Sequence, residues 1–175
     1  MEKIGFGGSC HWCTEAIFLS LKGIFDVSQG WIAPSDQPDR YSEAVIVKFD
    51  PAIITLEMLI AVHLQTHSCT SRHSMRDKYR SAIYCYNHHQ AESAMQAITR
   101  LQADFSDPII TEVVLFEDFK INKPAYLKYY YNDPSRPFCQ NIVNPKLREL
   151  IALFKDQVDS ERVGHLISEN RLSQM

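Results

Sequence analysis

The sequence of 175 residues contains no hydrophobic run that approaches the length of a membrane span. Met1 leads directly into a short apolar segment and no secretory signal peptide is recognised, so we expect a cytoplasmic protein. Repeats and low-complexity segments are also missing, and a charged content of 22% is typical of an ordinary globular surface.

The chain lacks a marked excess of charge of either sign. Its 18 Lys and Arg residues and 21 Asp and Glu residues give a net charge of -3, which disfavours nucleic acid as the main partner. Cysteine is scarce: five residues, an odd number in a reducing compartment, argue against a disulfide framework and for reactive or buried thiols. A second C-x-x-C motif is missing, so we expect no zinc site and no cofactor.

The hydrophobic content of 45% is enough for one sizeable core, and one domain is expected. Strands are predicted near residues 4–6, 24–32, 43–49, 80–86 and 109–116, and helices near 10–21, 55–66, 88–103, 122–131, 145–155 and 158–169. This alternation predicts an α+β (or α/β) domain, with a mixed central sheet and flanking helices. We expect the catalytic unit at residues 1–155, followed by a C-terminal helix and polar tail at 156–175.

The most informative segment is residues 6–18, FGGSCHWCTEAIF. Paired glycines let the chain turn sharply after the first strand, and Ser9 is predicted to cap a helix whose first turn contains Cys10. The unpaired N–H groups and the helix dipole at such a position stabilise a thiolate. The pattern therefore indicates that Cys10 is a nucleophile.

Cys10 and Cys13 also form a C-x-x-C motif, which has three interpretations. It could be a redox dithiol, half of a zinc site, or a nucleophile with an incidental neighbour. A lone C-x-x-C motif is weak evidence for a functional thiol, and the Gly-Gly-Ser segment before the helix makes this evidence stronger.

Other candidate groups have simpler explanations. His63 and His67 lie four apart near Cys69 and His73, which could form a metal cluster, but helix-end histidines facing solvent are the simpler interpretation. The tyrosines within residues 126–131 are interpreted as a half-buried helix face.

Two polar groups stand out near predicted strands. Glu43 lies at the start of a β-branched strand, where a glutamate exposed on the surface is the default interpretation. The alternative is a carboxyl group whose pKa is raised by apolar surroundings, so that it can donate a proton. Asp77, Tyr79 and Arg80 place a carboxylate, a phenol and a guanidinium within a few residues of one another. A solvated charged turn is the simpler explanation for this second group.

Cys139 follows a proline-rich stretch, which predicts an accessible loop, although a buried cysteine is the commoner outcome. If the loop interpretation holds, Cys139 can swing to Cys10. The geometry of a disulfide within a regular helical turn is unfavourable, so we expect Cys139 to be the resolving thiol, with Cys13 as the alternative if its helical turn frays.

Four segments together resemble the A-type peptide methionine sulfoxide reductases. These are residues 8–18 against G-C-F-W-[CG]-x-E-x-x-F, residues 41–45 with Asp50-Pro51 against H-A-E-[AV]-V and Asp-Pro, residues 78–83 against Q-Y-R-S-A-I, and Cys139 shortly before the P-K-L of residues 145–147. Their order and spacing agree over about residues 3–155. The resemblance implies a ferredoxin-like core and reduction of methionine sulfoxide, with preference for the S epimer.

The resemblance also implies roles for individual residues. Cys10 would attack the sulfoxide, Glu43 would donate a proton, Tyr79 would direct a hydroxyl at the oxygen, and Trp12 would form part of a methyl-binding wall. Cys10 would become a sulfenic acid, which a second thiol condenses to a disulfide. Thioredoxin would be the reductant, and oxidised proteins or free methionine sulfoxide the substrate.

The chain departs from the family pattern at several of these positions. His11 stands where the family has Phe, so a polar ring replaces half of the aromatic wall. Tyr41 stands at the family's His and could supply a hydroxyl to the substrate. Asp77 is expected to bind the substrate as well, although it lies nearer Tyr79 than the family's aspartate does. A thiol-disulfide oxidoreductase or redox sensor that uses Cys10 and Cys13 is the main alternative, and a non-catalytic binding module is the second.

Overall fold

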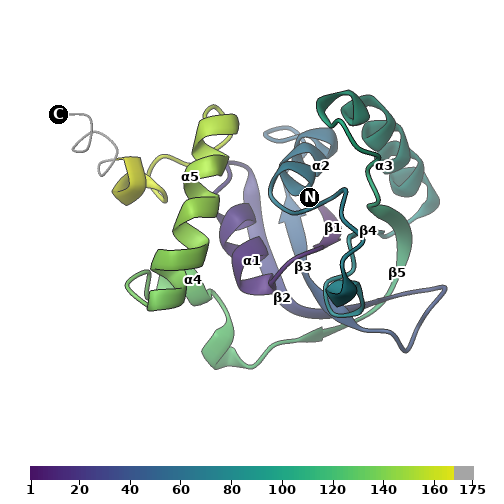
Figure 1. Ribbon diagram of the computed structural model, residues 1–175, viewed down its shortest axis with the longest axis horizontal. Coiled ribbons are helices and arrows are strands. Elements are labelled where there is room, and N and C mark those ends of the chain that lie inside the picture. Colours follow the sequence, from purple (N-terminus) through teal and green to yellow (C-terminus); the bar gives the residue numbers. More distant parts are fainter. Residues whose placement is uncertain (168–175) are drawn as a thin grey trace.

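The computed structural model describes residues 1–167, which form five strands and the helices around them (Figure 1). The strands are β1 (Glu2–Gly7), β2 (Ile24–Pro34), β3 (Ser42–Phe49), β4 (Ala82–Cys85) and β5 (Glu112–Ile121). The α-helices are α1 (His11–Leu19), α2 (Leu56–Gln65), α3 (His88–Leu101), α4 (Tyr129–Asn132) and α5 (Asn144–Leu153). Short 3-10 helices lie at Ser74–Asp77, Gln102–Asp104 and Pro124–Tyr126, and a π-helical turn lies at Cys139–Val143.

The strands form one mixed sheet that closes into a barrel in the order β1-β3-β2-β5-β4, with β4 paired back to β1. Only β4 and β5 are parallel among these pairs, and the other pairs are antiparallel. The predicted mixed sheet with flanking helices is therefore confirmed, and closure leaves the described part of the sheet without a free edge.

Alternate side chains of β3 enter two different apolar clusters. Val45 and Val47 belong to the main core beneath the helices, whereas Ala44 packs with Ile32 and Tyr84 in a small second cluster. This is the two-residue period of a strand whose two faces are both covered. The main core also contains the stacked rings of Phe6 and Phe18, whose centroids are 4.7 Å apart.

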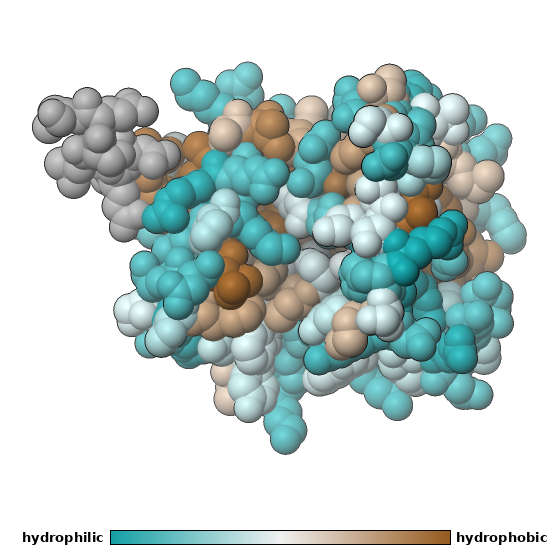
Figure 2. All heavy atoms as spheres, in the orientation of Figure 1, coloured by the Kyte–Doolittle hydropathy of each residue, from teal (hydrophilic) through white to brown (hydrophobic). Residues whose placement is uncertain are grey.

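The helices cover the sheet in two groups (Figure 1). Helix α1 packs on β2 and β3 and is covered by α4 and α5, while α3 packs on β4, β5 and α2. Polar side chains cover most of the face in view, and apolar ones reach the surface in small groups (Figure 2). No helix within residues 1–167 is long and apolar enough to cross a membrane.

The chain after β4 differs from the prediction in three places. Strand β5 runs from Glu112 to Ile121 rather than over residues 109–116, because it pairs with both β2 and β4. The prediction of one helix at residues 122–131 is wrong. Pro124 starts a short 3-10 turn, and the left-handed backbone of Lys128 (φ 51°) separates this turn from α4. Of the helix predicted near residues 158–169, one turn at 164–167 is present and the last two residues lie outside the described chain.

The segment after residue 155 packs back onto the end of α1. Val158 pairs with Leu21 as an isolated β-bridge, and Val163 and Leu166 are buried in the main core. The core therefore continues across the boundary expected at residue 155, because buried residues on both sides of it belong to the same cluster.

Candidate active site

Cys10 lies at the N-terminal end of α1, immediately before its first helical residue. Its backbone dihedrals of φ -51° and ψ 129° make it the N-cap, and the predicted cap Ser9 instead approaches the hydroxyl of Thr14 at 3.2 Å. The chain before it is tightly held: a Cβ added at Gly8 would lie 2.5 Å from Cδ2 of His67. Cys10 is therefore outside the regular helix and on a rigid turn.

The thiol of Cys10 is half-buried and acidic. A hydrogen bond from the Cys13 thiol and the backbone N–H groups of Trp12 and Cys13 lower the pKa of Cys10 to about 7, because together they outweigh the effects of burial and of the Glu43 carboxyl group. The same hydrogen bond, together with burial, raises the pKa of Cys13. A large share of Cys10 is therefore thiolate at neutral pH, while Cys13 keeps its proton.

Cys10 opens on a cavity of about 560 Å³. Its walls are Cys10, His11, Trp12, Trp31, Glu43, Lys78, Tyr79, Asn122, Lys123, Tyr126 and Phe138. A second cavity of about 540 Å³ lies on the other side of Cys10 and includes His67, Lys146 and Glu149. Cys10 and Tyr79 are common to both cavities.

Aromatic rings form one wall of the first cavity. The indole of Trp12 stacks on Tyr129 with centroids 4.0 Å apart, lies 5.6 Å from Tyr126 and meets Phe138 edge-on at 5.4 Å. The expectation that the tyrosines were only a helix face is corrected here, because Tyr126 lines the cavity and Tyr129 supports Trp12. Such a wall suits a small apolar group such as a methyl.

A buried carboxylate of α1 fixes this wall. The two oxygens of Glu15 accept the backbone N–H groups of Lys128 and Tyr129 at 3.0 and 3.1 Å. These bonds hold the left-handed Lys128 and the first turn of α4, so that Tyr129 faces Trp12. Burial raises the pKa of Glu15, although the backbone N–H groups act in the other direction.

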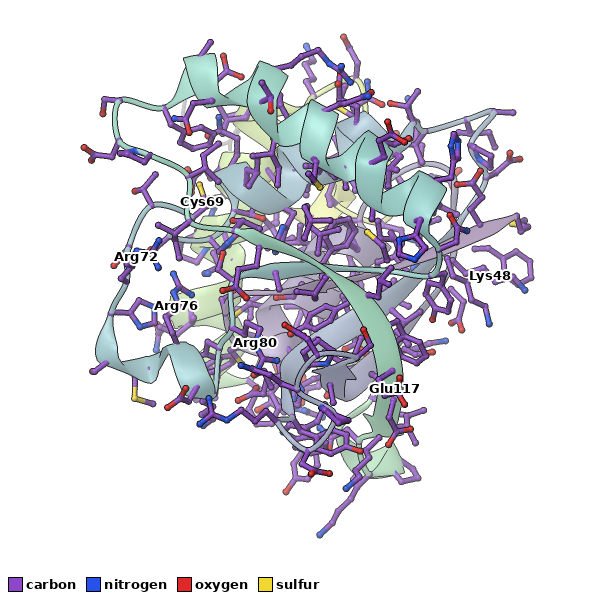
Figure 3. All side chains as sticks on the ribbon, turned by 90° about the vertical axis from the view of Figure 1, so that its right-hand side faces the viewer. Lys48, Cys69, Arg72, Arg76, Arg80 and Glu117 are labelled. Atoms are coloured by element: carbon purple, nitrogen blue, oxygen red, sulfur yellow. The ribbon has the colours of Figure 1, made fainter. Side chains whose placement is uncertain are left out.

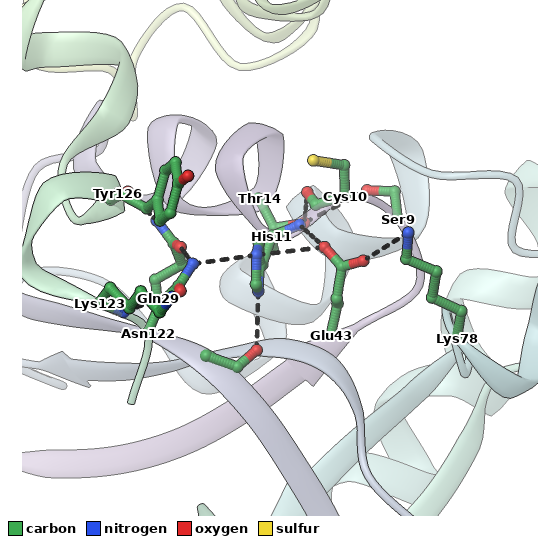
Figure 4. Close-up of polar contacts among 11 residues, drawn as sticks. Ser9, Cys10, His11, Thr14, Gln29, Glu43, Lys78, Asn122, Lys123 and Tyr126 are labelled. Atoms are coloured by element: carbon green, nitrogen blue, oxygen red, sulfur yellow. Dashed lines mark hydrogen bonds and ion pairs between the residues drawn. The ribbon is translucent and has the colours of Figure 1, made fainter. Parts of the chain in front are cut away.

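Glu43 is 5% exposed and lies at the start of β3, across from the N-terminus of α1. Its Oε1 is 3.3 Å from the backbone nitrogen of His11 and 3.2 Å from Nε2 of the same residue, and its Oε2 is 3.5 Å from Nζ of Lys78 (Figure 4). The predicted pair of Cys10 and Glu43 is thus brought to one cavity, although the residues are far apart in sequence. Sequence reasoning missed Lys78, Trp31, Asn122 and Lys123, for which it gave no signal.

Three other residues that the sequence suggested for the site do not lie where they were expected. Tyr41 donates its hydroxyl to Asp118 outside the cavity, and Asp77 is exposed and contacts Ser42 only through its backbone carbonyl. Cys139 is 0% exposed and lies in a π-helical turn that continues into α5. The predicted accessible loop at Cys139 is therefore wrong, since the chain there is helical and packed in the main core.

Neither of the two central histidines faces open solvent: His63 is buried and His67 is partly buried. His63 and His67 stack with centroids 4.2 Å apart behind the Gly7-Gly8 turn. His73, by contrast, is exposed and caps the 3-10 helix that precedes β4.

A family model and a sequence relative both point to the same protein family. The family described as peptide methionine sulfoxide reductase matches residues 2–158. Peptide methionine sulfoxide reductase MsrA of Trichodesmium erythraeum is 30% identical over 176 residues, covering 91% of this chain and 99% of the relative.

Solved structures agree on the fold. Mxr1 from Saccharomyces cerevisiae in reduced form superposes with a TM-score of 0.69 at 19% identity, covering 79% of this chain and 88% of that one. The same yeast protein in complex with Trx2 superposes with a TM-score of 0.59 at 18% identity, covering 73% and 84%.

Proposed function

Because the chain belongs to the peptide methionine sulfoxide reductase family, as a peptide-methionine (S)-S-oxide reductase, we propose that Cys10 attacks the sulfoxide and Glu43 protonates its oxygen. One observation carries this assignment: an acidic thiol and a buried carboxyl group meet in a single cavity with an aromatic wall. A sulfoxide sulfur becomes electrophilic when its oxygen accepts a proton, so both groups must reach one small functional group.

The first step balances with these two residues. The Cys10 thiolate attacks the sulfoxide, whose oxygen takes the proton of Glu43 and passes to Cys10 as a hydroxyl. A bond between Sγ of Cys10 and the oxygen forms as the S–O bond of the substrate breaks. Methionine leaves as the thioether, reduced by two electrons, and Cys10 becomes a sulfenic acid, oxidised by two. Glu43 is left as a carboxylate and regains its proton from water.

The aromatic wall and Tyr79 position the substrate in this proposal. The methyl group packs on Trp12 beside Tyr126 and Phe138, which line the cavity with it. Tyr79 lines the same cavity and directs its hydroxyl at the sulfoxide oxygen. The placement of Tyr41 and Asp77 outside the cavity gives no support to the substrate-binding roles expected for them.

For the second step we favour Cys13 as the resolving thiol over Cys139. The argument against Cys13 assumed that both cysteines lie within a regular helical turn, but Cys10 is the extended N-cap and its side chain is free of that constraint. Both candidate thiols are buried, at 1% exposure for Cys13 and 0% for Cys139, but the thiol of Cys13 acts directly on that of Cys10, whereas Cys139 lies in the π-helical turn before α5. Attack of the Cys13 thiol on the sulfenic acid forms the disulfide and releases water.

Thioredoxin is the reductant in this proposal. The support is the structure of the yeast relative in complex with Trx2, together with the half-exposed position of Cys10 between two cavities. Both oxidised proteins and free methionine sulfoxide fit the open cavity as substrates.

The finer description of the fold belongs with this proposal. The first four strands lie in the order β4-β1-β3-β2, and α1 and α2 connect β1 to β2 and β3 to β4. This is the split βαβ arrangement of a ferredoxin-like core, to which β5 adds the closing strand. We assign the catalytic residues to 1–155, and the segment that follows packs onto this unit through Val158, Val163 and Leu166.

The experiment is a single-turnover measurement of methionine sulfoxide reduction without a reductant. Glu43→Gln keeps the shape of the side chain but removes the acid, so the rate should fall roughly a hundredfold. Glu149→Gln, at the neighbouring cavity, is the matched control and should retain the rate. A rate within a few-fold of wild type in Glu43→Gln would remove Glu43 from the mechanism.

A further inference from the structure

His11 occupies a buried position between α1 and the sheet, with 4% of its surface exposed. Its Nδ1 lies 2.8 Å from the carbonyl oxygen of Gly30 on β2. A carbonyl oxygen only accepts hydrogen bonds, so Nδ1 must carry a hydrogen. This contact fixes one end of the ring and leaves Nε2 as the end that faces the cavity.

The free end of the ring meets the carboxyl group of Glu43. Nε2 of His11 is 3.2 Å from Oε1 of Glu43, and both groups are buried. Without a hydrogen between them two lone pairs would face each other, which is unfavourable in a buried site. The pair therefore holds one proton, either as imidazolium with carboxylate or as neutral imidazole with carboxylic acid.

Asn122 favours the neutral form of the pair. Its Oδ1 accepts the backbone N–H of Lys123 at 2.8 Å, which makes Nδ2 the donor. Nδ2 lies 2.7 Å from Oε1 of Gln29 and 3.4 Å from Nε2 of His11 (Figure 4). A donor directed at Nε2 requires a lone pair there, and burial lowers the pKa of His11 in the same direction.

The charged groups around the pair come from several elements. Cys10 at the start of α1 carries a negative charge as thiolate, which favours a proton on Glu43. Lys78, in the loop before β4, lies 3.5 Å from Oε2 and favours the carboxylate, but its side chain is 57% exposed. From β2 the ring meets the Gly30 carbonyl and the uncharged indole of Trp31 at 5.1 Å.

We propose that His11 is the proton partner of Glu43, so that the two share one proton that rests on Glu43 and is delivered to the sulfoxide oxygen. The inference rests on the proposed function for the use of that proton. When Glu43 gives up the proton, a carboxylate and a neutral imidazole remain, and water restores one proton to Oε1 or to Nε2. His11 is thus a positioning residue that acts through Glu43, rather than a wall of the methyl pocket.

The first test is nitrogen NMR of the histidine rings, which does not depend on turnover. The His11 signals are those lost in His11→Phe. We expect the Nδ1–H tautomer at neutral pH, and an Nε2 shift that changes in two steps, one for the shared proton and one for the imidazolium. Glu43→Gln should remove the upper step, and Glu149→Gln should leave both. An Nε2–H tautomer, or a single step unaffected by Glu43→Gln, would overturn the proposal.

The second test is the single-turnover rate above pH 7, where Cys10 is already mostly thiolate. His11→Phe removes one of the two sites for the proton, and the remaining Lys78 contact favours the carboxylate. The alkaline fall in rate should therefore move to lower pH by about one unit. His89→Phe, on the exposed side of α3, is the control and should leave the profile unchanged.

The outcomes separate the two proposals. If His11→Phe leaves the alkaline limb in place while Glu43→Gln loses the rate, the proposed function stands and the proton partnership is wrong. If Glu43→Gln retains the rate, the proposed function is wrong, and the NMR titration still decides whether the pair shares a proton.

Discussion

The ring of His63 donates through Nε2 to the carbonyl oxygen of Gly7 at 2.8 Å, and its Nδ1 is buried without a hydrogen-bond partner among residues 1–167. The neighbouring His67 donates from Nδ1 to the carbonyl of His63 and accepts the hydroxyl of Ser81 at Nε2, 2.7 Å away. The unpartnered Nδ1 of His63 indicates a neutral ring, and burial keeps the ring of His67 neutral as well. Burial holds the pKa of His63 well below its usual value and lowers that of His67 to about 4.

These two histidines predict a loss of stability in mild acid. An unfolded histidine titrates near pH 6.5, so the stabilisation is complete above that pH and is lost as pH falls toward the folded value of about 4 for His67. Between pH 7 and 5 the free energy of unfolding should fall by about 2 kcal/mol from His67 alone, and His63 adds to the fall in the same direction. Urea unfolding at several pH values measures the slope.

His67→Asn should reduce that slope by about half, whatever its effect on absolute stability. His89→Asn, an exposed histidine on α3, serves as the control and should keep the wild-type slope. Equal slopes in His67→Asn and wild type would contradict the assignment.

The acidity of Cys10 is tested by its alkylation. The rate of iodoacetamide reaction at Cys10 should be half-maximal near pH 7. Cys13→Ala removes the hydrogen bond that contributes most to this shift, so the midpoint should move toward the ordinary thiol value of about 8.5. Mass spectrometry of the Cys10 peptide gives the midpoint, and Cys69→Ala is the control. An unchanged midpoint in Cys13→Ala would assign the acidity to the backbone N–H groups alone.

Much of the fold followed from local sequence signals. The strand, glycine turn and helix around Cys10 were predicted because each signal lies within a few residues of its target. The helix predicted at residues 55–66 is likewise present as α2, with Thr55 as its N-cap accepting the N–H of Met58. The chain after β4 was predicted less well. The length of β5 depends on pairing with β2 and β4, and the left-handed Lys128 is held by Glu15, more than one hundred positions away.

The residues of the candidate site were likewise predicted only in part from the sequence. The type and position of Cys10 and Glu43 identified them in the sequence, and the structure brings them together. The setting of His11 could not be predicted, because it depends on Gly30, Glu43 and Asn122 from three separate segments. The burial of Cys139 was missed because a π-helical turn replaces the loop that the prolines indicated.

Arg76 links the polar loop before β4 to the turn that carries Cys10 (Figure 3). Its Nη1 donates to the carbonyl oxygens of Gly8 and Tyr79 at 2.8 and 2.9 Å, and its Nε and Nη2 donate to Ser71 and Ser68 in the loop. A planar guanidinium with several fixed donors is required for this arrangement, and an ammonium cannot reproduce it.

We expect Arg76→Lys to lower the single-turnover rate at least about tenfold, since small displacements of a nucleophile are costly. Circular dichroism should show that the fold is retained. Arg72→Lys, an exposed neighbour labelled in Figure 3, is the matched control. A wild-type rate in Arg76→Lys would mean that the Gly8 contact does not position Cys10.

The structure predicts which cysteine forms the disulfide with Cys10 after each turnover. Cys13 contacts the Cys10 thiol from the first turn of α1, and Cys139 reaches Cys10 only if the π-helical turn at the start of α5 opens. Peptide mapping of enzyme treated with sulfoxide and no reductant should therefore give a Cys10–Cys13 crosslink. Cys139→Ala should sustain multiple turnovers with thioredoxin, and Cys13→Ala should stop after about one. The buried Cys85→Ala is the control. A Cys10–Cys139 crosslink, with turnover lost in Cys139→Ala, would show that the turn opens during each cycle.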